Sequence, residues 1–160
     1  MITLYHGSNI SIDTVDLSFS RRGKDFGSGF YLNPDRQQAM EMASRTTQRM
    51  LEGKPIVTTF LFDDTLLKDN SPLNVKIFEE YSKEWAEFVL LNRKNSSDVP
   101  AHEYDVVVGP IANDTVGLQM RRFILGYISI ERMIEELRFK KPAIQYFFGT
   151  ELAVGYLKKI

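Results

Sequence analysis

The chain contains no cysteine and only two histidines, His6 and His102, among its 160 residues. Without cysteine it cannot form disulfides, bind a metal through thiolates or use a cysteine nucleophile. Two histidines also argue against a multi-histidine metal centre. The charge is nearly balanced, with 20 Lys and Arg against 21 Asp and Glu, so no net charge attracts the protein to nucleic acid or to an anionic membrane.

Long apolar runs and the common nucleotide-binding motifs are also missing. No segment approaches the roughly 18 consecutive apolar residues of a transmembrane helix, and the start lacks the basic flank and apolar run of a signal peptide. We therefore expect a cytoplasmic protein without membrane contact. The sequence holds neither a G-x-x-x-x-G-K-[ST] phosphate loop nor a G-x-G-x-x-G fingerprint, which argues against the folds that use them.

The composition is that of a folded domain, with 43% hydrophobic and 26% charged residues. Strand and helix patterns follow one another irregularly, and no linker or repeat divides them, so we expect one α+β domain spanning 1–160. The patterns predict strands at 1–5, directly before 33, and at 56–62, 74–78, 104–108 and 143–148, and helices at 34–52, 79–91, 129–137 and 150–157, while 114–123 is ambiguous. We expect Asn33, Ser129 and Thr150 to act as helix N-caps.

The N-terminal stretch MITLYHGSNI places His6 at a change from strand to turn. Residues 1–5 are apolar and β-branched, and residues 6–9 have the composition of a turn. A histidine at a strand end can point into a cleft, or it can satisfy hydrogen bonds within the turn. Ser8 with His6 as its base is a hydrolase alternative, although no glycine elbow surrounds this serine.

Two glycines, Gly27 and Gly29, stand among aromatic residues in the stretch DFGSGFYL. Glycine costs conformational entropy in a strand region, so the pair indicates a required bend or the close approach of a ligand. The alternative is a glycine-rich hairpin in which Phe30 and Tyr31 pack in the core. In the first case, the Tyr31 ring offers a flat face on which a ligand ring can stack.

Other polar groups carry weaker signals. The stretch GPIANDTV places Asn113 and Asp114 after a buried strand, where they form part of a site or an ordinary turn. His102 lies in a polar loop, and we expect it to face solvent. The acidic pairs at 63–64 and 79–80 have the character of solvated turn and helix-start residues, so no carboxylate pair for hydrolysis is evident.

Three short stretches, taken in order, resemble the three motifs of the ADP-ribosyltransferase fold: LYHGS at 4–8, FGSGFYL at 26–32 and QYFFGTELAVGYL at 145–157. The similarity is to the branch that includes diphtheria-type toxins and the poly(ADP-ribose) polymerases. The whole chain also resembles a bacterial family within this superfamily that is known only as a domain of unknown function, with segments similar to YHGS, DFGxGFYLT, FVxxNR and GPxAND. The fold that this resemblance implies is a split β-sandwich with flanking helices.

The resemblance also implies roles for individual residues. His6 would hydrogen-bond the adenosine-side ribose of NAD, and Gly7 and Ser8 would lie where backbone groups hold the nicotinamide amide. The Tyr31 ring would stack on nicotinamide. Arg21, in a basic loop just before the second motif, would reach the NAD pyrophosphate or an anionic acceptor, or it would remain solvated.

The third motif is where the chain departs from the family pattern. Polymerase-like members carry a catalytic glutamate at the start of a late strand, and the equivalent position here is Gln145. A neutral amide can accept the same ribose hydrogen bond, but it stabilises an oxocarbenium-like transition state less than a carboxylate does. Glu151 is the rival residue, although its position predicts a charge in the first turn of a closing helix. The stretch QYF also lacks the Q-x-E or E-x-E pair of arginine-specific members.

We therefore expect an NAD-dependent mono-ADP-ribosyltransferase that acts on a protein or nucleic-acid acceptor, with NAD as co-substrate. The alternative is a non-catalytic module that binds NAD or ADP-ribose. RNA 2′-phosphate transfer would call for a second histidine and a basic cleft, and the near-neutral charge argues against it. Relatives of this kind act as toxins or defence effectors, which adds a neutralising antitoxin to the suggested partners. The predicted set is catalytic His6, Tyr31 and Gln145 and NAD-binding His6, Gly7, Ser8, Gly27, Gly29, Tyr31 and Arg21, with no metal.

Overall fold

The computed structural model describes residues 1–112, 114–138 and 140–160, which form seven strands and five α-helices. Two 3-10 turns, η1 (Leu17–Phe19) and η2 (Asp64–Leu67), connect some of them. The mixed order of the elements confirms the α+β class. The strands are β1 (Ile2–Ser8), β2 (Phe30–Leu32), β3 (Ile56–Phe62), β4 (Val75–Ile77), β5 (Val106–Pro110), β6 (Ile144–Phe148) and β7 (Lys158–Lys159), and the helices are α1 (Arg36–Met50), α2 (Lys83–Lys94), α3 (Asp114–Ile124), α4 (Ile130–Leu137) and α5 (Glu151–Val154).

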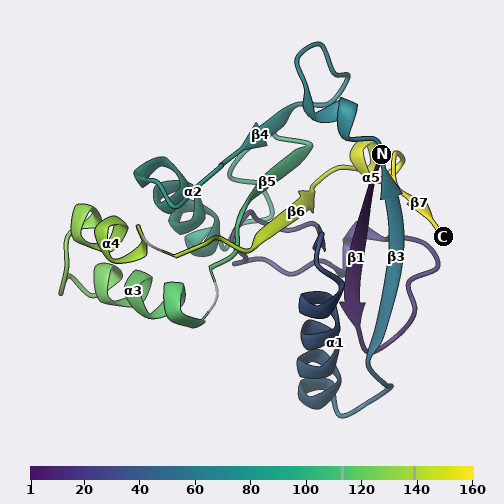
Figure 1. Cartoon of the computed structure of the whole chain (residues 1–160), viewed down its shortest axis with the longest axis horizontal. Coiled ribbons are helices and arrows are strands. Elements are labelled where there is room, and N and C mark those ends of the chain that lie inside the picture. The colour runs from purple at the N-terminus through teal and green to yellow at the C-terminus, as the bar shows by residue number, and fades with distance from the viewer. Residues whose placement is uncertain (113, 139) are drawn as a thin grey trace.

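The strands form two sheets (Figure 1), which one isolated backbone bridge connects. The first has the order β1-β3-β7 and is antiparallel, and the second has the order β2-β6-β5-β4, in which β4 pairs parallel with β5. Tyr5 of β1 and Asn33, directly after β2, exchange two backbone hydrogen bonds of 2.8 Å. This bridge fixes where the end of β1 lies relative to β2.

The first core lies between the two sheets. The rings of Phe62 and Phe148 meet edge to face with centroids 5.1 Å apart, and Leu4 and Val106 are fully buried beside them. Each such side chain contributes about 1.5–3 kcal/mol by leaving water. The two sheets therefore share one core, to which β1 and β3 contribute from one sheet and β2, β5 and β6 from the other.

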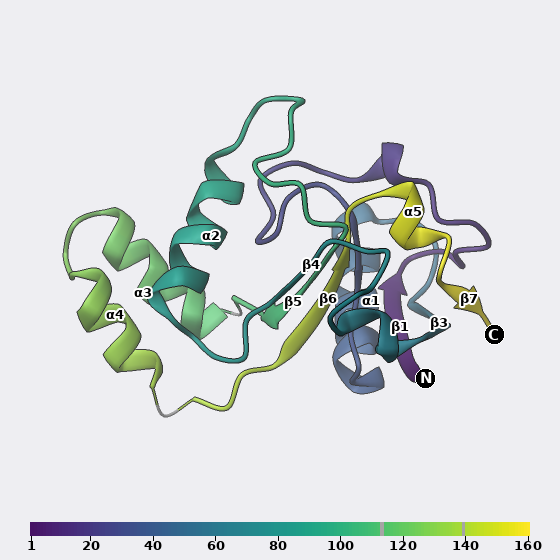
Figure 2. The ribbon, with the colours of Figure 1, turned by 90° about the horizontal axis from the view of Figure 1, so that it is seen from above.

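The second core lies on the opposite face of the four-stranded sheet, which α2, α3 and α4 cover (Figure 2). Trp85 of α2 is fully buried, and its Nε1–H donates to the carbonyl oxygen of Pro110 at 3.1 Å. Val107 and Phe147 of the sheet face this helix layer, while their neighbours along each strand face the other core. The strand alternation thus assigns successive residues of β5 and β6 to two different cores.

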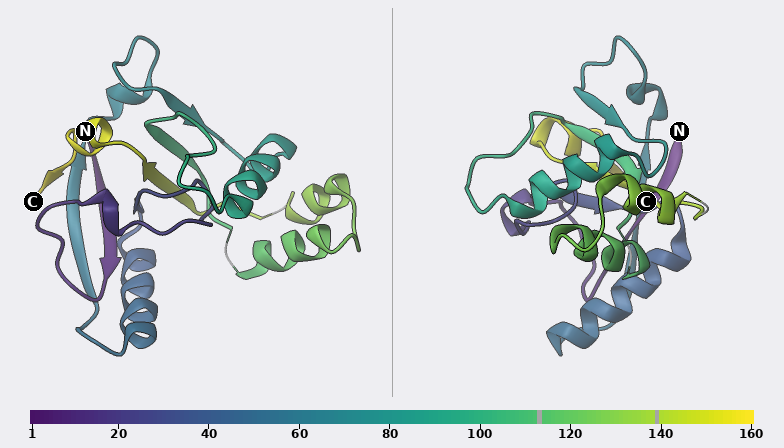
Figure 3. Two further views of the ribbon diagram at one scale, coloured as in Figure 1. Left: turned by 180° about the vertical axis from the view of Figure 1, so that it is seen from behind. Right: turned by 90° about the vertical axis from the view of Figure 1, so that its left-hand side faces the viewer.

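Helix α1 packs along β1, as Figures 1 and 3 show. A Cβ at Gly7 would collide with the carbonyl oxygen of Ala39 in this helix. The helix backbone therefore approaches β1 closely because position 7 has no side chain. The helix begins after Asp35, whose carboxylate accepts from the N–H groups of Gln37 and Gln38.

Several elements lie where local sequence signals place them. β3 has the predicted bounds, and β6 begins one residue later than expected and ends at the predicted residue. Ser129 caps α4 and Thr150 caps α5, each through a side-chain oxygen that accepts a backbone N–H. These signals act within one turn of chain, which is why the sequence alone reveals them.

Other predictions are wrong at the element ends. β1 continues through His6 and Gly7 to Ser8, because β3 pairs with all of them; the expected turn at residue 6 does not form. The cap of α1 is Asp35, not Asn33, whose side chain instead accepts from the Asp35 N–H at 2.7 Å. β5 continues through Gly109 and Pro110, where a break was expected, and α2 starts at Lys83 after the Ser82 cap. Residues 114–123, which the sequence left ambiguous, are helical, and β7 was not expected.

No helix of the described chain is both long enough and apolar enough to cross a membrane.

We predict that Gly7→Ala lowers the free energy of unfolding by about 3 kcal/mol, because the new methyl group forces α1 away from β1. The matched control is Gly117→Ala in α3, where a Cβ meets nothing within 4 Å. Since alanine favours a helix over glycine, this variant should gain about 0.5–1 kcal/mol. Urea unfolding curves of the two variants test this, and equal stabilities would contradict the close approach of α1.

Candidate functional site

His6 connects the two sheets through its side chain. Its Nδ1 lies 2.8 Å from the carbonyl oxygen of Tyr31, so Nδ1 carries the proton and Nε2 is the free acceptor of the neutral ring. The ring stacks on Phe30, with centroids 4.4 Å apart. Burial lowers the pKa of His6, and the charge of Lys24 lowers it further, although the bond to Tyr31 opposes both effects. At neutral pH His6 is therefore a neutral acceptor.

The N–H and C=O groups of Gly7 point to the edge of β1 that faces away from β3. Tyr5 directs both its N–H and its C=O to Asn33, which lies on the side of β1 away from β3. Because backbone groups change sides at every residue of an antiparallel strand, Gly7 directs its own pair the same way. A donor and an acceptor thus lie beside His6, where the sequence analysis places a backbone clamp.

Hydrogen bonds at the hydroxyl and contacts of the ring both hold the Tyr31 side chain in place. The hydroxyl donates to the carbonyl oxygen of Gly27 at 2.7 Å and accepts from the N–H of Phe26 at 3.1 Å. The ring meets Phe147 edge to face at 5.3 Å, and the Lys24 ammonium lies 4.9 Å from its centroid. Burial raises the pKa of the phenol, so it stays protonated. The Tyr31 ring therefore presents a face that already attracts a cation.

Two further positive charges lie near Lys24. Desolvation lowers the pKa of Lys24, and the charges of Arg21 and Arg49 lower it further. Arg21 comes from the loop before β2, and Arg49 comes from the last turn of α1. These three residues therefore contribute to one positive potential, which suits an anionic ligand.

Gln145 shares a sheet face with Tyr31. Tyr31 pairs with Phe147, and Gln145 lies two residues earlier on β6, so the three side chains point to the same side. The Gln145 Nε2 donates to Asp25 Oδ2 at 3.2 Å. Arg93 of α2 donates to the other oxygen of Asp25 through Nε at 2.8 Å and Nη2 at 2.7 Å.

Asp25 and Arg93 are functional candidates that the sequence analysis missed. Asp25 lies two residues before Gly27, and Arg93 ends the stretch FVLLNR at 88–93, which the resemblance already singled out. Their contact spans 68 residues of sequence, so no local pattern reports it. The only available signal was the shared membership of both residues in segments typical of one family.

The glycine pair is explained by the packing of the chain itself. Gly27 has φ +96°, which favours glycine, and a Cβ there would lie 3.0 Å from Oδ1 of buried Asn92. A Cβ at Gly29 would collide with the ring of Phe147. Both glycines therefore allow the bend that places Tyr31, and neither needs a ligand to account for it.

His102 does not face solvent, contrary to expectation. Its Nδ1 accepts from the N–H of Tyr104 at 3.1 Å, and its Nε2 lies 2.8 Å from the carbonyl oxygen of Phe26. The ring also packs against Phe88 and Phe147. These two bonds fix the neutral ring with the proton on Nε2, and burial lowers the pKa of His102. His102 therefore stabilises the bend at residues 26–27 through its hydrogen bond to the Phe26 carbonyl.

The remaining predicted residues lie outside the cluster or have other partners. Ser8 Oγ donates to Asn9 Oδ1 at 3.4 Å and, among the described residues, shares no hydrogen bond with His6, so no serine–histidine pair forms. Glu151 lies in the first turn of α5, as expected of a charge at a helix start. Asn113 lies outside the described residues. The described part of the chain contains no cluster of metal-binding side chains.

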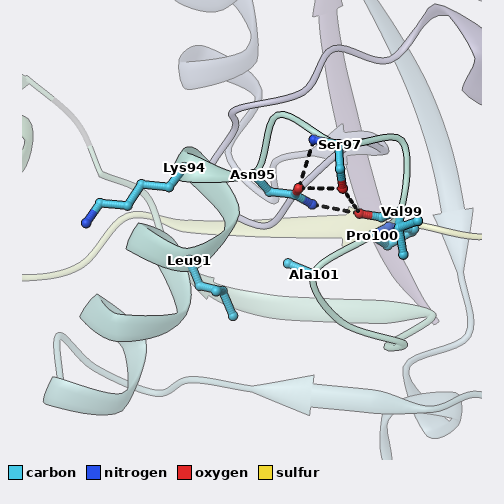
Figure 4. Close-up of a pocket in the computed structure, with 7 residues that line it drawn as sticks. All are labelled: Leu91, Lys94, Asn95, Ser97, Val99, Pro100 and Ala101. Carbon is cyan, nitrogen blue, oxygen red and sulfur yellow. Dashed lines mark hydrogen bonds between the residues drawn. The ribbon is translucent and has the colours of Figure 1, made fainter.

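A pocket of about 370 Å³ lies elsewhere, at the end of α2 (Figure 4). Three of its lining residues are hydrogen-bonded to one another: Asn95 Nδ2 donates to the Val99 carbonyl at 2.8 Å, and Ser97 donates to both residues. The lining, which also includes Leu91 and Ala101, contains none of the predicted site residues. We therefore place the candidate site at the His6–Tyr31–Gln145 cluster.

The cluster offers complementary groups for an elongated ligand. An aromatic face that attracts cations lies on Tyr31, and positive charge lies beside it on Lys24. A neutral imidazole acceptor and a backbone donor–acceptor pair come from His6 and Gly7. Such an arrangement suits a ligand with a cationic aromatic end and an anionic middle.

Both histidines make the stability of the fold depend on pH in the same direction. Their pKa values are lower in the folded state than the usual 6.5, so the unfolded chain takes up protons first as the pH falls. The stability that is present above about pH 6.5 should therefore be lost as the pH falls from there toward 5. Thermal melts between pH 8 and 5 test this, and His102→Gln should show a shallower decline. An identical decline in this variant would contradict the role of His102.

Comparison with known proteins gives a match over nearly the whole chain. No curated protein and no solved structure matches it. The family model described as "Protein of unknown function (DUF3990)" matches residues 2–159, and the chain therefore belongs to this family.

Proposed function

We propose that the protein is an NAD-dependent mono-ADP-ribosyltransferase. The observation that carries this proposal is the convergence of three stretches that are far apart in sequence. His6 bonds to the carbonyl oxygen of Tyr31 at 2.8 Å, and Tyr31 shares a sheet face with Gln145. The two-sheet sandwich with helices on its outer faces is consistent with the fold that the resemblance implies.

The chemistry of NAD fits the groups of this cluster. Its nicotinamide ring is a pyridinium cation, and the Tyr31 face already attracts the Lys24 ammonium. When nicotinamide takes that face, Lys24 moves toward the pyrophosphate, whose two negative charges also favour Arg21. The Gly7 backbone pair suits the carboxamide, and the free Nε2 of His6 can accept from a ribose hydroxyl.

The reaction breaks the bond between the ribose C1′ and the nicotinamide nitrogen. Nicotinamide leaves with the bonding electrons, and positive charge develops on the ribose. The Gln145 Oε1 accepts a hydrogen bond from the ribose 2′-hydroxyl and holds the sugar in place. An acceptor group then attacks C1′ and releases its proton, so that the products are nicotinamide, one proton and ADP-ribosylated acceptor. A single transfer is expected, because a neutral amide cannot deprotonate a ribose hydroxyl for chain extension.

A second candidate is a module that binds NAD or ADP-ribose without catalysis. The observation that favours it is the bond from Gln145 to Asp25, which commits one end of this amide to the protein. Binding would then use the same groups, but nicotinamide would stay attached.

We predict that the protein releases nicotinamide from NAD when a cell lysate supplies the acceptor. Gln145→Ala should lower this rate at least about tenfold, because the ribose loses an orienting hydrogen bond. The matched control is Tyr127→Ala, whose ring is 75% exposed between α3 and α4, and this variant should keep full activity. Release is followed by chromatography of nicotinamide, and labelled NAD identifies the acceptor. Binding without release in any lysate would favour the second candidate, and absence of NAD binding would contradict both.

A comparison of NAD with ADP-ribose separates the roles of Tyr31 and Lys24. Tyr31→Leu should weaken NAD binding by about 3- to 10-fold and leave ADP-ribose unaffected, because only NAD carries the stacked ring. Lys24→Met should weaken both ligands by about tenfold, because both contain the pyrophosphate. Calorimetry measures the four dissociation constants, and Tyr31→Phe is the control that keeps the ring. Equal losses for both ligands in Tyr31→Leu would contradict the stacking role.

A further inference from the structure

The carboxylate of Asp25 is the most highly connected polar group near the site. Oδ1 accepts two hydrogen bonds from the guanidinium of Arg93, and Oδ2 accepts from the Ala112 N–H and from Gln145 Nε2, each at 3.2 Å. Only 13% of the Asp25 side chain is exposed, so little water competes for these four bonds. A carboxylate has room for about four acceptor bonds, and all are in use.

The donors are three residues, and together with Asp25 they come from four parts of the chain. Asp25 lies before β2, Arg93 lies in the last turn of α2, Ala112 follows β5, and Gln145 is the second residue of β6. These are the segments DFGSGF, FVLLNR, GPIAND and QYFFGT, which the sequence analysis noted for other reasons. The Asp25 carboxylate is therefore the common contact of segments that are up to 120 residues apart.

We propose that Asp25 is the positioning residue of the site: it fixes the Gln145 amide with its oxygen directed away from Asp25 and requires an amide rather than a carboxylate at position 145. The reason is hydrogen-bond direction. Asp25 accepts only, so Gln145 must turn its NH₂ group toward Asp25 and its Oε1 away. The oxygen is then free for the hydroxyl of a ligand. The part that concerns NAD rests on the proposed function.

The same geometry accounts for the departure from the family pattern. A glutamate at 145 would place a second carboxylate within about hydrogen-bond distance of Asp25 Oδ2, where like charges repel unless the pair shares a proton. The other charged or titratable groups that face Asp25 are Arg93, Lys24 and the Tyr31 phenol. Arg93 already donates twice to Asp25 and can neutralise only one of the two charges, and among the described residues Lys24 forms no ion pair that would neutralise the other. The negative charge of the site thus resides on residue 25 instead of residue 145.

An exchange of the two side-chain types tests this proposal. The variants are Gln145→Glu, Asp25→Asn and the double variant Asp25→Asn/Gln145→Glu, which restores one carboxylate and one amide in exchanged positions. The control is Gln37→Glu, which adds the same charge at an exposed position of α1. Thermal melts between pH 5 and 8 use no ligand, and calorimetry with NAD follows.

We expect Gln145→Glu to melt about 5 °C or more below the unaltered protein at pH 8 and close to it at pH 5, where the pair retains a proton. Gln37→Glu should show no such trend, and the double variant should lose it. Asp25→Asn should bind NAD at least about fivefold more weakly, and the double variant should recover most of this loss.

Three results would overturn the proposal: a Gln145→Glu variant with the melting profile of the control, an Asp25→Asn variant that binds NAD normally, or a double variant no better than Asp25→Asn. If the unaltered protein does not bind NAD, the proposed function fails, and the melting profiles alone decide whether Asp25 determines the residue type at position 145.

Discussion

The alternation of side chains along β6 is the constraint on which both the fold and the candidate site depend. Phe148 points into the core between the sheets, and Phe147 points into the core under α2. Gln145 shares the face of Phe147, so it lies at the end of the helix-covered face rather than in the core between the sheets. A shift of the β6 register by one residue would turn Gln145 toward the core between the sheets and would remove Phe147 from the core under α2. The hydrophobic packing of β6 therefore also determines where its one amide lies.

The ion pair between Asp25 and Arg93 contributes more to the geometry of this arrangement than to the stability of the fold. The Arg93 side chain is 31% exposed, and ion pairs that retain solvent contact contribute little net free energy. The bonds have fixed directions, however, and they join the loop before β2 to α2 and to β6. His102 adds a second connection to the same bend through the Phe26 carbonyl. The bend that places Tyr31 is thus held both by the Asp25–Arg93 pair and by the hydrogen bond of His102.

The sequence reveals the local part of this structure and misses the non-local part. The caps at Ser129 and Thr150 depend on bonds within three residues, and they were predicted correctly. The end of β1 was predicted wrongly, because its last three residues are held by β3, about 50 residues away. The glycines of DFGSGF were noticed, but their reason, the approach of Asn92 and Phe147, lies in distant segments.

The candidate site follows the same division. His6, Tyr31 and Gln145 were found because they lie in short stretches that resemble known motifs. Asp25 is an ordinary acidic residue in a polar loop until α2 and β6 bring their donors to it. His102 was misjudged for a similar reason: its loop is polar in composition, yet the aromatic rings that cover it come from α2 and β6.

The helical segment between β5 and β6 leaves and rejoins the sheet at adjacent positions. Pro110 pairs with Ile144, and the Ile111 N–H donates to the Ala143 carbonyl at 2.7 Å, so the two strands form a hairpin whose connection contains α3 and α4 (Figure 3). In topological terms, a short turn could replace this connection without altering the order of the sheet. In energetic terms it could not, because Met120 and Met133 complete the apolar surface over Trp85. During folding, the ends of this long loop close at an entropic cost that rises only slowly with its length. The length of the helical connection therefore adds little to the cost of pairing β5 with β6.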